Sequence, residues 1–397
     1  MNWPALGIEE LCEINIGRTP DRNNLAFWSG DNTWLSIADL NGSQYVEKSK
    51  EAISDKAVKD CKCKPVPENT VVFSFKLSIG KIAITSKTLF TNEAIAAFPI
   101  KDAKRIDTKY LYFYLKSIDA SSLGDKAVKG ITLNKEKLRK IKIPLPPLPI
   151  QKKIAAVLDK ADSLKQNNKQ LLEHYNQLTQ SIFYEMFGYN GQLESKYEKL
   201  PLSSVSEIVS GVTLNSKNVN PEWRSYPYLR VFNVQDGFFD LSEIKQVKVS
   251  QAEFDRYVLK KNDILLTEGG DPDKLGRGSI WNSEINNCVH QNHIFRVRIM
   301  SEDYHPVFIS SLLGSTYGKK YFLKAAKQTT GIASINSTQL KAFPLIKPSF
   351  SLQKKFSSVI QKTNEAKEHA KINIDKSEHL FQSLLQKAFK GELVKEP

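Results

Sequence analysis

The strongest constraint on this chain is an internal repeat. The segment 130–154 returns as the segment 331–356, and from Asn134 and Asn336 onward the two copies keep a constant offset of 202 residues. Upstream, the agreement is looser: Gly17-x-Thr19 matches Gly211-x-Thr213 at an offset of 194. A single repeat of this length predicts two similar halves, because a solenoid would repeat every 20–50 residues.

Each copy ends in a segment with the pattern of a coiled-coil helix. No Gly or Pro interrupts residues 150–187, and apolar residues there alternate at spacings of four and three. Pro149 lies where a first helical turn tolerates proline, and Gly188 lies where a helix C-terminus favours glycine. The second copy runs to Gly391 with a more polar middle. The predicted seam comprises Ile150, Ile154, Val157, Ala161, Leu164, Leu171, Tyr175, Leu178, Ile182, Leu352, Phe356, Val359, Ala366, Leu380 and Leu384.

Two like helices separated by a folded segment can pair antiparallel within one chain; the alternative is two unrelated surface helices. A helix of about 38 residues is a rod of ~57 Å, long enough to hold two modules a fixed distance apart. We therefore expect a globule at 1–149, a helix at 150–188, a globule at 189–350 and a helix at 351–397.

The globular halves favour an α+β fold of two mixed α/β domains. Short β-rich runs bounded by Gly, Asn, Asp or Pro predict strands at 71–75, 81–85 and 95–98, and at 228–234, 263–267 and 293–299. Short helices are expected at 110–117 and 306–327. The segment 91–95, which enters a strand in the first half, is interpreted as the counterpart of 291–295.

The composition favours a polyanionic partner. The formal charge is +14, and cations that neutralise phosphates release condensed counterions. The alternative is a basic protein that binds no nucleic acid. No run of ~18 apolar residues predicts a membrane span, and the cysteines outline no disulfide framework, so we expect a cytoplasmic protein.

The proline-rich segment before the first predicted long helix shows a family resemblance. The segment 130–154, with Pro144, Pro146, Pro147 and Pro149 followed by the heptad helix, resembles the central region of specificity subunits of type I restriction-modification enzymes. Prolines at these positions favour a stiff, extended connector. The second copy departs from this run at 343–348.

The resemblance implies a fold and a set of partners. Two target-recognition domains would each read one half of a split, asymmetric site in double-stranded DNA. The two helices would form an antiparallel coiled coil that sets the gap and docks methyltransferase subunits, two of them expected. Restriction subunits would join the same complex.

The sequence offers no catalytic motif of its own. It lacks a glycine-rich cofactor loop and the Asn/Asp-Pro-Pro-aromatic string of a base-flipping methyltransferase; Asn220-Pro221 is the nearest match. Gly80-Lys81 is followed by Ile82, so no phosphate-binding loop is predicted. Cys288, His290 and His293 lack the spacing of a structural zinc site. We expect a non-catalytic subunit with no cofactor and no metal.

Two rival hypotheses stay open: a coiled-coil scaffold without a DNA role, and a fragment of a fused DNA methyltransferase or nuclease. If DNA is the partner, cations and amides in loops should contact bases and phosphates. The predicted DNA-binding residues are Arg18, Thr19, Lys76, Lys81, Lys126, Lys129, Thr132, Arg230, Asn233, Lys274, Arg277, Lys327 and Thr329.

Overall fold

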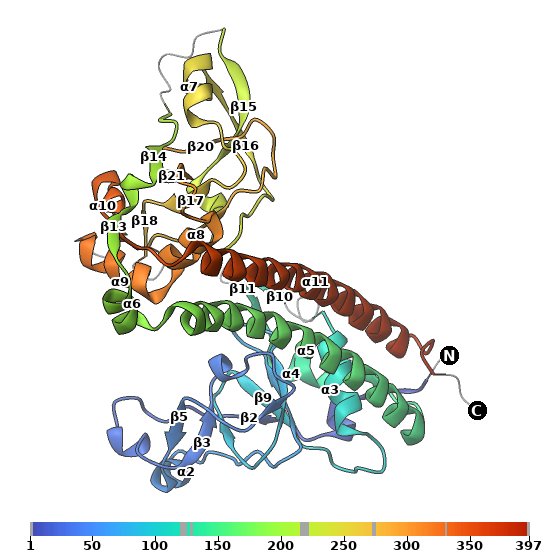
Figure 1. Ribbon diagram of the computed structural model, residues 1–397. Coiled ribbons are helices and arrows are strands. Elements are labelled where there is room, and N and C mark those ends of the chain that lie inside the picture. Colours follow the sequence, from blue (N-terminus) through green and yellow to red (C-terminus); the bar gives the residue numbers. More distant parts are fainter. Residues whose placement is uncertain are drawn as a thin grey trace. The chain divides into compact units, whose positions relative to one another are not determined.

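The computed structural model describes residues 3–119, 125–127, 130–214, 222–271, 275–329 and 332–394. The chain divides into two compact units. Unit 1 comprises Met1–Gln170 together with Lys371–Pro397, and unit 2 comprises Leu171–Ala370. Each unit therefore contains a piece of both long helices, α5 (Leu148–Phe187) and α11 (Phe350–Phe389), which are green and dark red in Figure 1.

Unit 1 is a mixed α/β globule built on two sheets, with strand orders β2-β9-β6-β7-β4 and β5-β3-β8. Strands β6, β7 and β9 are buried along their whole length, which explains why their sequences read as continuous apolar runs. The elements of unit 1 outside the long helices are β1 (Ala5–Gly7), α1 (Ile8–Leu11), β2 (Asn15–Ile16), η1 (Leu25–Phe27), β3 (Asn32–Leu35), η2 (Ile37–Asp39), β4 (Tyr45–Val46), β5 (Glu51–Ile53), α2 (Asp55–Asp60), β6 (Val71–Ser74), β7 (Ile82–Thr85), β8 (Phe90–Thr91), β9 (Ile95–Phe98), α3 (Thr108–Ser117), β10 (Asp125–Ala127), β11 (Gly130–Thr132), α4 (Lys135–Arg139) and β12 (Lys142–Pro144).

Unit 2 repeats this plan with sheets ordered β14-β21-β17-β19 and β16-β15-β20 and a further sheet β18-β23-β22. Its elements outside the long helices are α6 (Asn190–Lys196), β13 (Lys199–Pro201), η4 (Leu202–Ser204), β14 (Ser206–Ser210), β15 (Arg224–Leu229), η5 (Val231–Asn233), β16 (Lys245–Val249), α7 (Gln251–Tyr257), β17 (Ile264–Thr267), β18 (Gly269–Gly270), β19 (Gly278–Ile280), β20 (Val289–His290), β21 (Ile294–Ile299), α8 (Pro306–Gly314), α9 (Thr316–Ala325), β22 (Lys327–Thr329), β23 (Ile332–Ser334), α10 (Ser337–Lys341) and β24 (Pro344–Ile346).

The duplication extends to the pairing of the central strands. Strand β3 is parallel to β8 as β15 is parallel to β20, and β6 is antiparallel to β9 as β17 is antiparallel to β21. The antiparallel pair β1 and β12 in unit 1 has its counterpart in β13 and β24 of unit 2. The repeat therefore extends through the upstream regions, where the sequences agree only at scattered positions.

Two predicted elements of unit 2 were wrong in detail. The strand expected at 228–234 ends at Leu229, because Asn233 accepts a hydrogen bond from the Arg230 backbone N–H (2.8 Å) and closes a turn at η5. The helix expected at 306–327 is two helices, since Ser315 ends α8 and its hydroxyl caps the Gly318 N–H (3.4 Å) of α9.

The long helices end as their sequences predict. Gly188 follows α5 with a φ of 109°, and Gly391 follows α11 with a φ of 76°. Both angles lie in the left-handed region that glycine adopts at little cost. Within the described ranges, no helix combines the length and apolarity needed to cross a membrane.

Within unit 1, α5 and α11 run antiparallel. Lys165 of α5 lies 3.6 Å from the Glu378 carboxylate of α11. Further along α5, Asn168 donates to the backbone oxygen of Asn373 (3.2 Å) and to the hydroxyl of Ser377 (3.3 Å). Residue numbers thus rise on one helix as they fall on the other, which is the orientation that the repeat predicts.

The predicted coiled-coil seam is only partly buried. Ile150, Ile154, Ala161 and Phe356 are buried, whereas Tyr175, Ile182, Leu352, Ala366 and Leu384 are half-buried. The prediction was wrong for Val157, Leu164, Leu171, Leu178, Val359 and Leu380, whose side chains are 37–46% exposed.

The reason is that each long helix packs on a globule as well as on its partner helix. In unit 1 the core that contains α3 and the sheets also contains Ala155 and Leu158 of α5 and Phe381 of α11. In unit 2, Phe183 and Phe187 of α5 pack on Phe356 of α11, with ring centroids 5.7 and 5.2 Å apart. A heptad pattern assumes that the helix packs on one partner helix only. When a globule covers the helix as well, the centre of the buried face lies at other residues than the heptad predicts.

Each long helix is fastened to its own globule by a buried glutamine. In unit 1, Gln151 is fully buried and its amide nitrogen donates to the carbonyl oxygens of Arg105 (2.9 Å) and Pro146 (2.8 Å). Its amide oxygen accepts from the N–H of Asp107 (2.9 Å), the residue that caps α3.

Gln353 makes the same set of bonds in unit 2. It donates to the carbonyl oxygens of Asp303 (3.1 Å) and Pro348 (3.0 Å) and accepts from the N–H of His305 (2.9 Å), which caps α8. We call these two sets of bonds the glutamine locks. They explain why the repeat retains glutamine at this position of both helices.

Replacing Gln151 or Gln353 by methionine should lower the free energy of unfolding of the affected unit by about 3 kcal/mol. Methionine keeps the shape of the side chain but leaves buried carbonyl and N–H groups without partners. Differential scanning calorimetry measures the effect, with Lys153→Met at an exposed neighbouring position as control. Equal unfolding temperatures for Gln151→Met and Lys153→Met would show that the lock adds no stability.

Candidate nucleic-acid interface

The predicted DNA-binding residues Arg18 and Thr19 lie where three segments of unit 1 meet. The Arg18 N–H donates to the Thr91 carbonyl (2.8 Å), and the Asn92 N–H donates to the carbonyl of Leu35 (3.0 Å), the last residue of β3. We call the meeting of segments 17–19, 35–39 and 91–93 the unit 1 junction.

Unit 2 builds the same junction from segments 211–213, 229–233 and 290–292. The Val212 N–H donates to the His290 carbonyl (2.7 Å), and the Gln291 N–H donates to the Leu229 carbonyl (2.9 Å). These bonds pair Asn92 with Gln291, an offset of 199. The correspondence of 91–95 with 291–295 inferred from the sequence was therefore wrong by one residue.

Close packing at the junction explains the matched glycines. A Cβ on Gly17 would lie 2.1 Å from the Thr91 carbonyl oxygen, and a Cβ on Gly211 would lie 2.0 Å from that of His290. Such contacts are far too short for any side chain. The Gly-x-Thr match between the halves thus records a packing constraint, and the residues around it are those that vary in chemistry.

The unit 1 junction presents polar groups around an open hollow of about 370 Å³, lined by Arg18, Thr19, Cys61 and Glu93. Arg18 is exposed, and its guanidinium donates to the Cys61 carbonyl (3.2 Å). The Thr19 hydroxyl donates to the Glu93 carboxylate. This arrangement holds a cation and a carboxylate side by side at the surface, where the cation can meet a phosphate or a guanine edge and the carboxylate can accept from a cytosine amino group.

Matched cations lie beside the matched turns of both units. The Lys81 ammonium donates to the carbonyl of Ile37 in η2 (3.2 Å), and the Arg277 guanidinium donates to the carbonyl of Val231 in η5 (3.5 Å). Both residues were predicted from the sequence as DNA contacts. The sequence did not indicate that they occupy equivalent places.

One predicted contact is withdrawn. Asn233 is fully buried, and its amide nitrogen donates to the carbonyls of Asp240 (2.7 Å) and Glu243 (3.0 Å). Its oxygen accepts from the Arg230 N–H, so the side chain shapes the η5 turn and has no group left for a base. Arg230 is partly exposed and pairs with Glu243 (3.1 Å).

The other predicted contacts are spread over the two units. Lys76 is exposed with its ammonium 5.4 Å from the Phe75 ring, and Lys327 is exposed at the start of β22. Lys129 and Lys274 lie outside the described residues. For Lys126, Thr132 and Thr329 the structure describes the backbone in β10, β11 and β22 but not the side chains.

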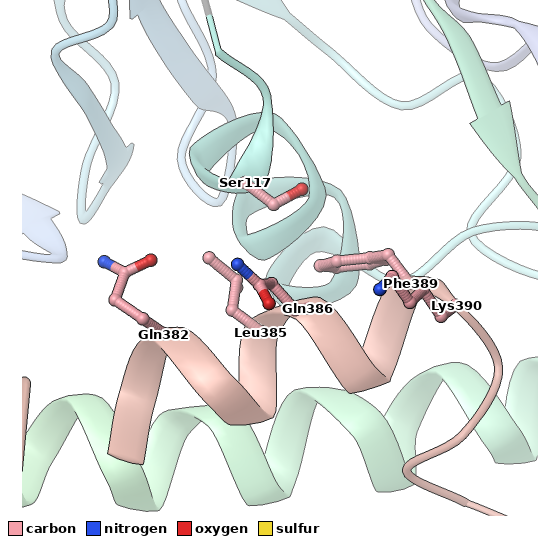
Figure 2. Close-up of a pocket in the computed structure, with 6 residues that line it drawn as sticks. All are labelled: Ser117, Gln382, Leu385, Gln386, Phe389 and Lys390. Atoms are coloured by element: carbon pink, nitrogen blue, oxygen red, sulfur yellow. The ribbon is translucent and has the colours of Figure 1, made fainter. Parts of the chain in front are cut away.

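A second hollow, of about 270 Å³, lies between the end of α3 and the last turns of α11 (Figure 2). Gln386 lines it in unit 1. The position 202 residues earlier is Tyr184, whose hydroxyl bonds to the Thr316 hydroxyl in unit 2. Among the described residues, no group of three or more His, Cys, Asp and Glu could hold a metal ion.

His290, which matches Thr91, is buried beneath the unit 2 junction. Burial and the nearby Arg296 cation lower its pKa to about 4. One ring nitrogen, Nδ1, lies 3.1 Å from the Tyr257 carbonyl oxygen. The folded unit therefore holds this imidazole neutral.

The stability of unit 2 should fall in acid because of His290. The unfolded chain binds a proton near pH 6.5 and the folded unit only near pH 4, so stability falls as pH drops between these values, by about 3 kcal/mol in all. His290→Asn keeps a donor for Tyr257 and removes the titration. Urea unfolding from pH 7.5 to 4 should give a flatter curve for the variant; parallel curves would contradict the assignment.

Comparison with known proteins identifies the family. The family model described as type I restriction modification DNA specificity domain matches residues 2–174 and, a second time, residues 194–376. The two matches coincide with the two copies of the repeat. The chain belongs to this family.

Similar proteins carry the same designation. The chain is 24% identical to the type I restriction enzyme MjaIX specificity subunit of Methanocaldococcus jannaschii, covering 99% of this chain and 94% of the relative. It is also 24% identical to the EcoKI specificity subunit of Escherichia coli K12, covering 83% and 78% of the two chains.

Solved structures share the fold. The S subunit of a type I restriction-modification system from M. genitalium aligns with a TM-score of 0.58 at 18% identity, covering 98% of this chain and 96% of that one. A chain from work on assembly and conformational transition of the type I R-M system aligns with a TM-score of 0.60 at 15% identity, covering 99% and 98%. The α+β fold of two mixed domains and two long helices, expected from the sequence, is confirmed.

Proposed function

We propose that this chain is the DNA-reading subunit of a type I restriction-modification enzyme, in which each unit reads one half of a bipartite, asymmetric site. The observation that carries this is the pair of junctions. They have one backbone plan but different polar groups: Arg18 and Glu93 line the first, whereas at the second Asn292 takes the place of Glu93, and Val212, in the place of Arg18, is buried. Different side chains on equal frameworks suit two unlike base sequences.

In this proposal the recognition domains are 1–149 and 189–350, and the helical segments 150–188 and 351–397 set the gap between the half-sites. Arg18, Thr19, Lys76, Lys81, Arg230, Arg277 and Lys327 stay as proposed DNA contacts. Lys126, Lys129, Thr132, Lys274 and Thr329 stay as predictions from the sequence alone.

The long helices also suit a second task, the docking of methyltransferase subunits. Val157, Leu164, Leu171 and Leu178 repeat every seven residues along α5, and all four are exposed. We call them the α5 stripe. A heptad of exposed apolar residues suits a further helix that packs along this face. Helix α11 repeats the pattern more weakly, with Val359 and Leu380 exposed, which favours two docked subunits of unequal affinity.

Catalysis would belong to the partners. The proposed methyltransferase subunits would bind S-adenosylmethionine and modify adenine, and ATP-driven restriction subunits would cleave. The chain itself would supply sequence recognition and spacing. A scaffold without a DNA role is the rival hypothesis from the structural class, and a fragment of a fused methyltransferase or nuclease is the rival among enzymes; DNA affinity and cofactor binding of the chain distinguish them.

Co-expression with a methyltransferase subunit of the same system should methylate one split motif with unlike halves and a constant gap, because each unit is expected to read its own half-site. Single-molecule sequencing of genomic DNA reads the modified adenines. Deleting seven residues from each long helix should change the gap or abolish assembly. A motif with two identical halves would contradict recognition by unlike junctions.

Leu164→Lys and Leu171→Lys should each weaken methyltransferase binding about tenfold or more, because each removes the burial of one leucine at the proposed contact. Both side chains are already exposed, so the unfolding temperature should stay at the wild-type value. Analytical ultracentrifugation of the purified subunits measures assembly. Leu25→Lys, at an exposed leucine of η1 outside the α5 stripe, is the control. Equal losses of methyltransferase binding in all three variants would rule out a specific contact at the stripe.

A further inference from the structure

An exposed phenylalanine sits at the unit 2 junction. Phe232 is the middle residue of η5, and its side chain is 51% exposed. A few residues on, Phe238 is 50% exposed. The exposed ring of Phe232 is therefore available to a ligand that binds at this junction.

The turn that carries Phe232 is held rigid by hydrogen bonds. The Gln235 side chain donates to the Phe232 carbonyl (2.6 Å), and the Gln235 N–H donates to the Phe238 carbonyl (3.0 Å). The Gly237 N–H donates to the carbonyl of Gly278 (2.9 Å), which ties the loop to β19. A side chain presented in this way loses little freedom when it meets a ligand.

One guanidinium group lies near the phenylalanine ring, and a second bonds to the turn that carries it. Arg230 lies with its guanidinium carbon 6.0 Å from the Phe232 ring centroid, and Arg277 donates to the carbonyl of the preceding residue, Val231. Glu243 opposes Arg230 at 3.1 Å. An exposed apolar group with two cations at the same turn fits a ligand that has both an apolar group and nearby anions.

The unit 1 junction differs at the equivalent positions. Ser36 takes the place of Arg230, since its N–H bonds to Asp39 as that of Arg230 bonds to Asn233. Two residues into this turn, Ala38 takes the place of Phe232. The aromatic contact is thus a property of unit 2 and distinguishes the chemistry of the two halves.

We propose that Phe232 packs against the 5-methyl group of a thymine in the major groove of the half-site read by unit 2, with Arg230 and Arg277 on the flanking phosphates or base edges. The thymine methyl is the apolar group that the major groove displays, and the backbone on either side is anionic. This inference rests on the proposed function. It adds that the unit 2 half-site contains a thymine recognised through its methyl group by Phe232.

The test uses the complete chain assembled with its methyltransferase subunit and duplexes that contain the split site. Each thymine is replaced in turn by deoxyuridine, which removes only the methyl group. At one position in the unit 2 half-site, the wild-type complex should lose about fourfold in affinity, the value expected for one buried methyl-sized group. Fluorescence anisotropy at constant salt measures the dissociation constants.

The variant Phe232→Ala should bind the natural site about tenfold more weakly and should no longer distinguish thymine from deoxyuridine at that position. Met300→Ala, at another exposed apolar residue of unit 2, is the matched control and should keep the wild-type response. A thymine effect that persists in Phe232→Ala overturns the inference. So does a Phe232→Ala complex that binds DNA normally but loses methyltransferase, because Phe232 would then contact protein.

Two results distinguish the role of Phe232 from the DNA-reading function as a whole. Specific binding with no sensitive thymine in the unit 2 half-site overturns the role of Phe232 and leaves the DNA-reading function intact. A well-formed wild-type complex that binds the split site no better than unrelated DNA overturns both.

Discussion

Everything in this structure depends on burying a long helix against two neighbours at once. A helix of 40 residues such as α5 gains most of its stability from packing, and the two ends of α5 share apolar cores with a globule and with α11. Apolar contact gives little rotational precision, because a helix face can roll by several degrees at small cost. The glutamine locks remove that freedom, since the amide of Gln151 or Gln353 meets two carbonyls and one N–H only in one orientation.

The duplicated frame separates what must stay the same from what can differ. The backbone bonds of the two junctions require glycine at Gly17 and Gly211, whereas the next residue is an exposed arginine in unit 1, Arg18, and a buried valine in unit 2, Val212. Lys81 and Arg277 occupy equivalent places beside the two turns. Their charge is the same in both units, but the geometry of the charged group differs. Arg presents a planar fork where Lys presents a point charge, so the same position can bond to different base edges.

The sequence predicted the parts of the fold that follow from periodicity. The repeat, both long helices with their terminal glycines, and most strands were read correctly, because these features repeat over many residues. It could not place the seam, since Val157 and Leu164 fit a heptad while the globule draws Ala155 and Leu158 inward. The sequence also led to the wrong prediction that Asn233 contacts a base. A sequence does not distinguish a buried asparagine that closes a turn from an exposed asparagine that binds adenine. The exposure of Phe232 left no sequence signal, as Val231 and Val234 around it are equally apolar.

The composition of unit 1 has a consequence for synthesis. Its core joins Ile150 and Ile154 of α5 to Phe381 and Leu385 of α11, and the whole of Leu171–Ala370 is translated between these two segments. At roughly 5 to 20 residues per second, the apolar face near Ile154 waits on the order of 10 to 40 s for its cover. Unit 2, which is continuous in the chain, has all of its residues before then. During synthesis, the second unit can therefore already be folded while the first unit still lacks the part of its core that α11 supplies.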